Sequence, residues 1–346
     1  MTKSRHPLTM VLIAGLTGVL AAVSGAPVPG RAAAASGETT VPDASWSCGM
    51  PAGIPWPERG TPVLTATLRL GAVHDVGVTP SGYRRVLDVS GGTLAGDRVT
   101  GTVLSGGLEY ELTLATGTTE IEQLHMVRFA DNSIGYLRTC GVTAGDVTVV
   151  VPDFEVANSS ANAWLNTGRF AGVRTVDAAS GTVRLAVYDI SGVPADGPTV
   201  TVTDPAGVPH QSWDCVTGTG ARGATVFSEA VTLGGSLSVG ASKRGTRNVI
   251  PITGGTVSGR VAGTIVPGGA DYQLIGSTAR LDARYLLRTN DGEYIVVRNC
   301  GAFGQLIPVF EARAAGPYHF LNTGRFLSSD PQLQGGGVLI VFYERR

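Results

Sequence analysis

Charged residues and histidine are both scarce in this sequence. Charged residues make up 15% of the 346 positions and histidine occurs five times, whereas glycine occurs 49 times. So little charge argues against long solvated helices and against a disordered chain, which would be rich in charge and poor in apolar residues. Abundant glycine instead favours many short strands joined by tight turns.

Motifs that mark common catalytic sites are missing as well. No histidines or carboxylates have the spacing of a metal site, and no G-x-S-x-G motif marks a nucleophilic serine. Residues 218–223 fit G-x-G-x-x-G, but the VFSEAVTL that follows predicts a strand where a dinucleotide site needs a helix. We therefore expect no metal and no cofactor. Without clustered Lys and Arg, we expect no nucleic-acid partner.

Residues 1–35 are typical of a secretory signal peptide. A basic start with Lys3 and Arg5 precedes an apolar run from Leu8 to Val23, and residues 33–35 offer a small-residue cleavage site. That run is too short to span a membrane comfortably, and no later stretch is apolar enough to do so. The sequence predicts a secreted, extracellular protein with no membrane segment after cleavage.

The rest of the chain repeats itself in order. GTVLSGGLEYEL from Gly101 returns as GTIVPGGADYQL from Gly263, and WLNTGRF from Trp164 returns as FLNTGRF from Phe320. Repeated segments in a constant order indicate duplicated domains. We expect a first repeat over residues 36–192, a Pro-rich linker over 193–206 and a second repeat over 207–346.

Paired glycines divide each repeat into short β-branched runs, and each pair predicts a hairpin turn. The pairs are Gly91-Gly92, Gly106-Gly107, Gly254-Gly255 and Gly268-Gly269, and Asp291-Gly292 adds a further hairpin signal. The runs alternate: in LDARYLLRT, Asp282, Arg284 and Arg288 share one face. Leu281, Ala283, Tyr285 and Leu287 share the other. Many short alternating strands predict an all-β barrel or sandwich.

Four cysteines occupy equivalent positions in the two repeats. In an exported chain they predict disulfides, although four cysteines allow three connectivities. The repeat favours Cys48–Cys140 and Cys215–Cys300, because each domain would then be closed by its own bridge. Each bridge would stabilise its domain by roughly 4–5 kcal/mol in the chain-entropy model. Unpaired buried thiols are the alternative.

The second repeat resembles the domain of unknown function 3237 family. The resemblance rests on GTRNVIPITGGTVSG, PGGADYQL, LDARYLLRTNDG and the late FEARAAGPYHFLNTGRF; the first repeat is a diverged copy that keeps Phe154-Glu155 and Leu165-Asn166. It implies a calycin-like antiparallel β-barrel, usually single and cytoplasmic, whose biochemical role is unsettled. The expected fold class is thus all-β, with two tandem antiparallel barrels, each holding one intradomain disulfide.

A set of polar residues distinguishes the second repeat from the first. These candidate ligand-binding residues are Arg247, Asp271, Asp282, Arg284, Glu311 and Asn322, and their first-repeat counterparts are Arg84, Glu109, Glu122, Leu124, Glu155 and Asn166. If they point into the second barrel, they would form a pocket for a polar small molecule. Leu124 is the first-repeat counterpart of Arg284, and this difference suggests that only the second barrel keeps the full polar set.

The same residues also admit structural interpretations. Asp282 and Arg284 could form an exposed ion pair worth about 0–1 kcal/mol, and Asp271 could cap its own turn. Glu311 and Asn322 could bond backbone groups where the barrel closes. Against these, we expect Arg284 to point inward and to meet Asp271, Asp282 or Glu311, and Arg284→Leu to cost little stability. We also expect few contacts between the repeats.

Three functions remain open at this point. The favoured one is a secreted binding module that holds a small molecule or the end of a glycan in the second barrel. The second is an enzyme, such as a lyase, isomerase or glycoside-active enzyme, that uses paired carboxylates and an arginine. The third is a purely structural surface protein. Binding is favoured because no nucleophile–base pair, metal site or cofactor motif is visible.

Overall fold

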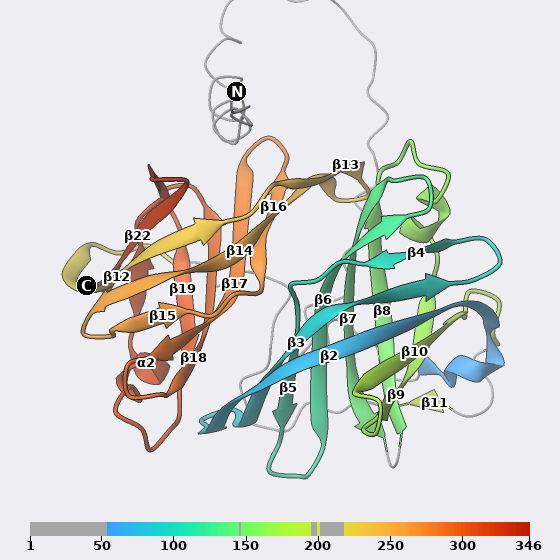
Figure 1. Cartoon of the computed structure of the whole chain (residues 1–346), viewed down its shortest axis with the longest axis horizontal. Coiled ribbons are helices and arrows are strands. Elements are labelled where there is room, and N and C mark those ends of the chain that lie inside the picture. Colours follow the sequence, from blue (N-terminus) through green and yellow to red (C-terminus); the bar gives the residue numbers. More distant parts are fainter. Residues whose placement is uncertain (1–53, 145–146, 195–198, 201–217) are drawn as a thin grey trace, which may run out of the picture. The chain divides into compact units, whose positions relative to one another are not determined.

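The computed structural model describes residues 54–144, 147–194, 199–200 and 218–346 (Figure 1). The predicted signal peptide, most of the predicted linker, Cys48 and Cys215 lie outside these residues. The chain is all-β, as predicted. Within the described residues, helical structure is limited to η1 (Pro57–Arg59), η2 (Ala163–Asn166) and α2 (Phe320–Thr323), and the small strands β1 (Ile54–Pro55) and β11 (Thr199–Val200) pair with each other.

The first repeat forms an antiparallel sheet that closes on itself. Its nine strands are β2 (Thr61–Thr79), β3 (Gly82–Ala95), β4 (Thr100–Val103), β5 (Gly107–Thr113), β6 (Thr119–Phe129), β7 (Ile134–Ala144), β8 (Val147–Val156), β9 (Phe170–Asp177) and β10 (Thr182–Asp189). Strand β2 pairs with β10 on one side and with β3 on the other. The path through β9, β8, β7 and β6 returns to β3, so this repeat is the expected closed barrel.

The second repeat forms an eleven-stranded sheet. Its strands are β12 (Arg222–Leu233), β13 (Leu237–Ser242), β14 (Gly245–Gly259), β15 (Gly263–Ile265), β16 (Ala270–Ile275), β17 (Ala279–Thr289), β18 (Tyr294–Ala302), β19 (Ile307–Glu311), β20 (Phe326–Ser328), β21 (Gln332–Gln334) and β22 (Gly337–Arg345). The path runs from β19 to β20, and no ladder joins these two ends. A backbone hydrogen bond at 3.1 Å joins Ser328 N on β20 to the O atom of Leu306, the residue before β19.

The hairpin turns predicted at glycines are only partly confirmed. Asp291-Gly292 makes the expected hairpin between β17 and β18. Gly91-Gly92 and Gly254-Gly255 instead lie inside the long strands β3 and β14, so the hairpin prediction is wrong there. Each long strand changes partner near its glycines, and Gly254, at φ 136°, adopts a backbone conformation that disfavours other residues.

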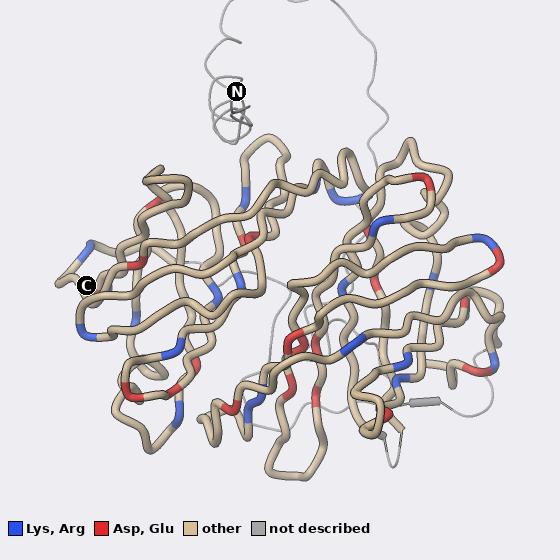
Figure 2. The backbone as a smooth tube through the Cα atoms, viewed as in Figure 1, with Lys and Arg blue, Asp and Glu red and all other residues tan. Residues whose placement is uncertain are grey.

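Each repeat has its own apolar core. Phe154, Leu165 and Leu185 are among the buried residues of the first, whereas Phe227, Phe310 and others fill the second. Alternation along the strands separates two faces. On β17, Tyr285 and Leu287 belong to the second core, whereas Leu286 belongs to a different cluster. Charged positions are sparse along both sheets (Figure 2).

The apolar cluster that contains Leu286 joins the two repeats, so the expectation of few contacts between them is wrong. It combines Val76, Val86, Leu108, Tyr110, Leu124, Met126 and Tyr136 of the first repeat with Val239, Val249, Ala270, Tyr272 and Leu286 of the second. The rings of Tyr136 and Tyr272 lie 5.1 Å apart. Apolar side chains on the outer face of each sheet are therefore buried by the other repeat and not exposed to solvent.

The predicted disulfides fall partly outside the described residues. Cys140 on β7 and Cys300 on β18 are each 1% exposed. Their expected partners are not described, so both pairings remain predictions. In the described part of the chain, no helix is long and apolar enough to cross a membrane.

Candidate functional site

The six predicted site residues lie in three different places. Arg247, Glu311, Asp282 and Arg284 belong to ionic contacts on or beside the surface between the repeats. Asp271 belongs to a polar network on the other face of the sheet. Asn322 holds backbone near the end of β19. The expectation that one pocket inside the second barrel gathers all six is wrong.

Arg247 and Glu311 take part in matching contacts across the two repeats. Arg247 donates two hydrogen bonds to Glu155 of the first repeat, from Nη2 at 2.7 Å and from Nε at 3.1 Å. The counterpart Arg84 donates from Nε to Glu311 at 2.8 Å. Burial would raise the pKa of Glu155, but the charge and hydrogen bonds of Arg247 outweigh it and hold that pKa below its ordinary value. The two equivalent pairs make the contact self-complementary.

Arg284 lies on the outer face of β17 and not inside the second barrel. It does meet Asp282, from Nε at 3.1 Å and from Nη2 at 2.9 Å, and it also donates from Nη1 to Glu122 at 2.6 Å. Glu122 comes from the first repeat. Alternation predicted that Arg284 and Asp282 share a face, but it could not tell which face looks into the barrel.

The carboxylates around Arg284 are strongly stabilised as anions. Asp282 also accepts from Arg298, at 2.9 Å from Nε, and Glu122 is paired with Arg138. Burial would raise the pKa of each acid, but the neighbouring arginines outweigh it and hold both pKa values below their usual range. Every charge in this network has a partner, so the network is suited to joining the two repeats.

Asn322 acts as a backbone clip. Its Oδ1 accepts from Ala312 N at 2.8 Å and its Nδ2 donates to Ala312 O at 2.9 Å. Asn166 holds Val156 in the same way in the first repeat. The structural interpretation of this residue is therefore confirmed.

Asp271 faces the interior of the second repeat, because its neighbours Ala270 and Tyr272 face the first repeat. It accepts from Gln273 Nε2 at 2.8 Å and from the backbone of Asp282 at 3.1 Å. Burial raises the pKa of Asp271 to about 6. Glu229, on β12, shares that interior face, and burial raises its pKa to about 8 although Tyr285 donates to it at 2.5 Å.

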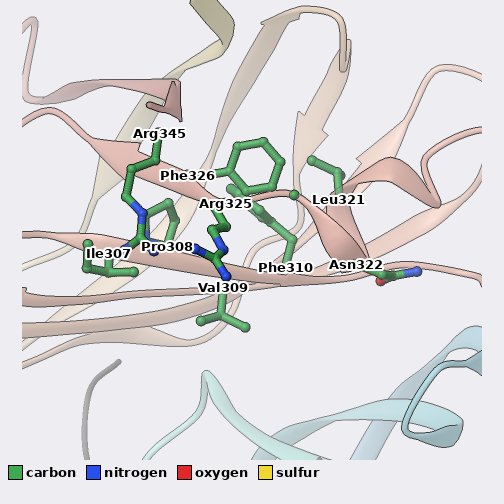
Figure 3. Close-up of a pocket in the computed structure, with 10 residues that line it drawn as sticks. Ile307, Pro308, Val309, Phe310, Leu321, Asn322, Arg325, Phe326 and Arg345 are labelled. Carbon is green, nitrogen blue, oxygen red and sulfur yellow. The ribbon is translucent and has the colours of Figure 1, made fainter. Parts of the chain in front are cut away.

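A pocket of about 140 Å³ lies at the seam where the second sheet fails to close. Phe310, Leu321 and Phe326 contribute apolar surface, and Arg325 and Arg345 contribute two cationic side chains. Figure 3 shows both arginine side chains extending toward β19. Among the described residues, neither guanidinium forms an ion pair; the nearby Glu344 is paired with Arg260 at 3.0 Å. Asn322 also lines this pocket.

The interior of the first barrel also contains polar side chains, contrary to the expectation that only the second repeat keeps a polar set. Glu109, the counterpart of Asp271, is fully buried and accepts from Gln123 and Arg174. His125 lies nearby on the same face of β6 as Gln123 and is 1% exposed. In the described residues, no group of His, Cys, Asp and Glu could hold a metal ion.

Comparison with known proteins identifies the family. The family described as protein of unknown function (DUF3237) matches residues 59–150 and 223–305, about half of the chain and one segment in each repeat. The chain belongs to the DUF3237 family.

Two curated relatives of this DUF3237 protein are named as UPF0311 proteins. A UPF0311 protein of Rhodopseudomonas palustris (strain TIE-1) is 32% identical over 118 residues, which are 32% of this chain and 77% of that protein. A UPF0311 protein of Bradyrhizobium diazoefficiens is 36% identical over 95 residues, 27% of this chain and 62% of that one. A crystal structure of a protein of unknown function from Rhodopseudomonas palustris shares 23% identity at TM-score 0.35, covering 39% of this chain and 98% of that one.

Sequence reasoning missed the two arginines of the seam pocket in this DUF3237 protein. Arg325 lies in the LNTGR segment, and because both repeats contain this segment, comparing the repeats does not single out its arginine. Arg345 replaces a residue of the first repeat: its backbone N–H donates to Arg325 O at 2.8 Å, as that of Ile190 donates to Arg169 O at 2.8 Å. Comparing the last strands of the two repeats would have revealed this change.

Proposed function

We propose that the second repeat is a barrel left open at one seam and that it binds a small organic anion there. The carrying observation is the pocket of about 140 Å³ with apolar walls and two arginines that have no described acidic partner. We further propose that the chain works outside the cell, held by disulfides Cys48–Cys140 and Cys215–Cys300, as the N-terminal segment and the repeated cysteines predict.

The charge of the pocket favours an anion. Arg325 and Arg345 each offer a guanidinium group, and such groups bind carboxylate or phosphate through charge-assisted hydrogen bonds. Two cations that line one pocket repel each other until an anion joins them. Gly218 leaves room for Arg345, since a Cβ there would lie 2.3 Å from its Nη1.

The volume and the apolar lining of the pocket indicate which organic group should carry the anionic charge of the ligand. A cavity of roughly 150 Å³ lined by apolar groups accommodates a benzene-sized molecule. Here Phe310 and Phe326 provide aromatic surface, with ring centroids 5.4 Å apart. An aromatic or branched carboxylate therefore fits better than a large glycan, and this narrows the ligand class expected from the sequence.

The first repeat lacks this site. Its strand β8 pairs with β9, so the equivalent seam is closed. Ile190, buried at 3% exposure, stands where the second repeat has Arg345. Since the framework is otherwise duplicated, the open seam and the added arginine support a role specific to the second repeat.

Calorimetric titration of the secreted protein with benzoate and with benzyl alcohol tests the proposal. Benzoate should bind at least about tenfold more tightly, because a hydrogen bond to a charged group contributes about 1.5–3 kcal/mol. Arg345→Gln should remove that preference, whereas Arg169→Gln, which changes the counterpart of Arg325, should leave it intact. Equal affinity for the two compounds, or equal loss in both variants, would contradict an anion site at the seam.

A further inference from the structure

The edge of β19 forms one wall of the seam pocket. The pocket touches four consecutive residues of this strand, from Ile307 to Phe310. Consecutive side chains point to opposite faces of a sheet, so a pocket that touches all four runs along the edge of the strand, where its backbone lies. Arg325 and Phe326 line the pocket as well (Figure 3). The seam therefore offers a ligand backbone atoms in addition to side chains.

The backbone polar groups of Pro308 and Phe310 point toward this edge. Before them, Leu306 O accepts a hydrogen bond from the backbone of β20 at 3.1 Å. After them, the N and O atoms of Ala312 bond a side chain from α2 at 2.8 and 2.9 Å. Backbone groups along an antiparallel strand alternate between its two edges, so Pro308 and Phe310 share the direction of Leu306 and Ala312.

These backbone groups lack a partner strand. Among the described strands, β19 pairs with β18 alone, which lies at its other edge. Over the residues that the structure describes, no backbone hydrogen bond from another segment reaches Phe310 N–H or the O atoms of Pro308 and Phe310. Backbone groups away from water normally have a partner. Because this edge borders a pocket of about 140 Å³, an amide group of a ligand can serve as one.

The charge and length of the edge favour a peptide end over a free amino acid. Arg325 and Arg345 attract a carboxylate, but they would repel the α-ammonium group that a free amino acid carries beside it. The amide nitrogen of a peptide carries no charge. The edge from Ile307 to Phe310 spans about 10 Å, at roughly 3.4 Å per residue. Two or three residues of an added strand cover that length.

The equivalent edge of the first repeat is unsuited to a carboxylate. Asp153 on β8 occupies the register position of the exposed Val309 on β19. Its own negative charge would repel the ligand, and it is already paired with Lys243 at 2.6 Å. Ile190 stands where the second repeat has Arg345. The combination of a neutral strand edge with two nearby arginines is therefore particular to the second repeat.

We propose that the anion bound at the seam is the carboxyl terminus of a peptide, which adds to the edge of β19 as a short strand. Its carboxylate lies between Arg325 and Arg345. Its last side chain, which is branched or aromatic, packs on Phe310 and Phe326. Its amide groups bond the backbone of Pro308 and Phe310. This inference rests on the proposed function, because it requires the anion site, and it adds the chemical class of the ligand.

Calorimetric titration with four probes tests the inference. They are acetyl-Gly-Leu, its ester analogue with oxygen in place of the Gly–Leu N–H, its C-terminal amide, and 4-methylpentanoate, which lacks a peptide backbone. Acetyl-Gly-Leu should bind about three- to tenfold more tightly than the ester and than 4-methylpentanoate, through its backbone hydrogen bonds. It should bind at least about tenfold more tightly than the C-terminal amide, through its charge.

Hydrogen exchange and two variants locate the binding. The Phe310 amide should exchange more slowly with acetyl-Gly-Leu bound, and 4-methylpentanoate should not slow it. Arg345→Gln should remove the preference for the acid over the C-terminal amide. The matched control Arg169→Gln, in the first repeat, should keep that preference.

The outcomes separate this inference from the anion site itself. Equal affinity for the peptide and its ester, or unchanged exchange at Phe310, would overturn the added strand. If benzoate and 4-methylpentanoate bind and the peptide gains nothing over them, the inference fails and the anion site stands. If no carboxylate binds to the folded protein, both fail.

Discussion

Replacing Arg284 by leucine should destabilise the protein by about 2–3 kcal/mol. The sequence alone suggested a small effect, because leucine occupies the equivalent position in the first repeat. In the structure the guanidinium is 6% exposed and donates two hydrogen bonds to Asp282 and one to Glu122. Leucine would remove all three bonds and leave both carboxylates buried.

The expected loss of stability depends on the arginine partners that Asp282 and Glu122 retain. Removing one partner of a buried ion pair typically costs about 3–5 kcal/mol. Asp282 retains Arg298 at 2.9 Å, and Glu122 retains Arg138. Because each acid still has a cation, the cost should lie toward or below the lower end of that range.

Urea unfolding, followed by tryptophan fluorescence without reducing agent, provides the assay. Arg288→Leu is the matched control, since Arg288 lies on the same face of β17 and is exposed, and it should change the free energy of unfolding by less than about 0.5 kcal/mol. A second comparison combines Arg284→Leu with Glu122→Gln, where the effects should be non-additive. An Arg284→Leu protein as stable as the Arg288→Leu control would refute the role assigned to this network.

Three further outcomes are expected. First, stability should fall by up to about 1.4 kcal/mol per pH unit between about pH 6.5 and 8, and Glu229→Gln should abolish this fall. Burial raises the folded-state pKa of Glu229 from 4.5 to about 8, so over that range the unfolded chain is ionised while the folded chain is not; below pH 6.5 the lowered pKa of His125 acts in the opposite direction. Urea midpoints at three pH values measure this, and an unchanged slope in the variant would disprove it. Second, isolated residues 207–346 should self-associate in sedimentation experiments, because the face that carries Tyr272 and Leu286 would lose its cover; a monomer that melts cooperatively would count against it. Third, peptide mapping should link Cys48 to Cys140 and Cys215 to Cys300, and a peptide joining Cys140 to Cys300 would exclude self-contained bridges.

The residues of the candidate site were only partly predictable. The cross-repeat contacts involve residues far apart in sequence, such as Arg284 with Glu122, 162 positions away, and Arg247 with Glu155, 92 positions away. No local sequence pattern predicts a contact between residues so far apart. The seam arginines were overlooked for another reason. Arg325 lies in LNTGR, which both repeats contain, and Arg345 lies on the last strand, which the repeated motifs do not cover.

The sequence by itself determined the duplication, the all-β class and the division of each strand into two faces. These follow from local chemistry: repeated motifs keep their order, and side chains alternate along a strand. Only the tertiary structure decided which face of β17 lines the core of the second repeat and which meets the first repeat. Both faces are buried, one by the core of the second repeat around Tyr285 and one by the first repeat around Leu286. Alternation records that the faces differ, but burial inside a barrel and burial beneath a neighbouring repeat leave the same pattern in a sequence.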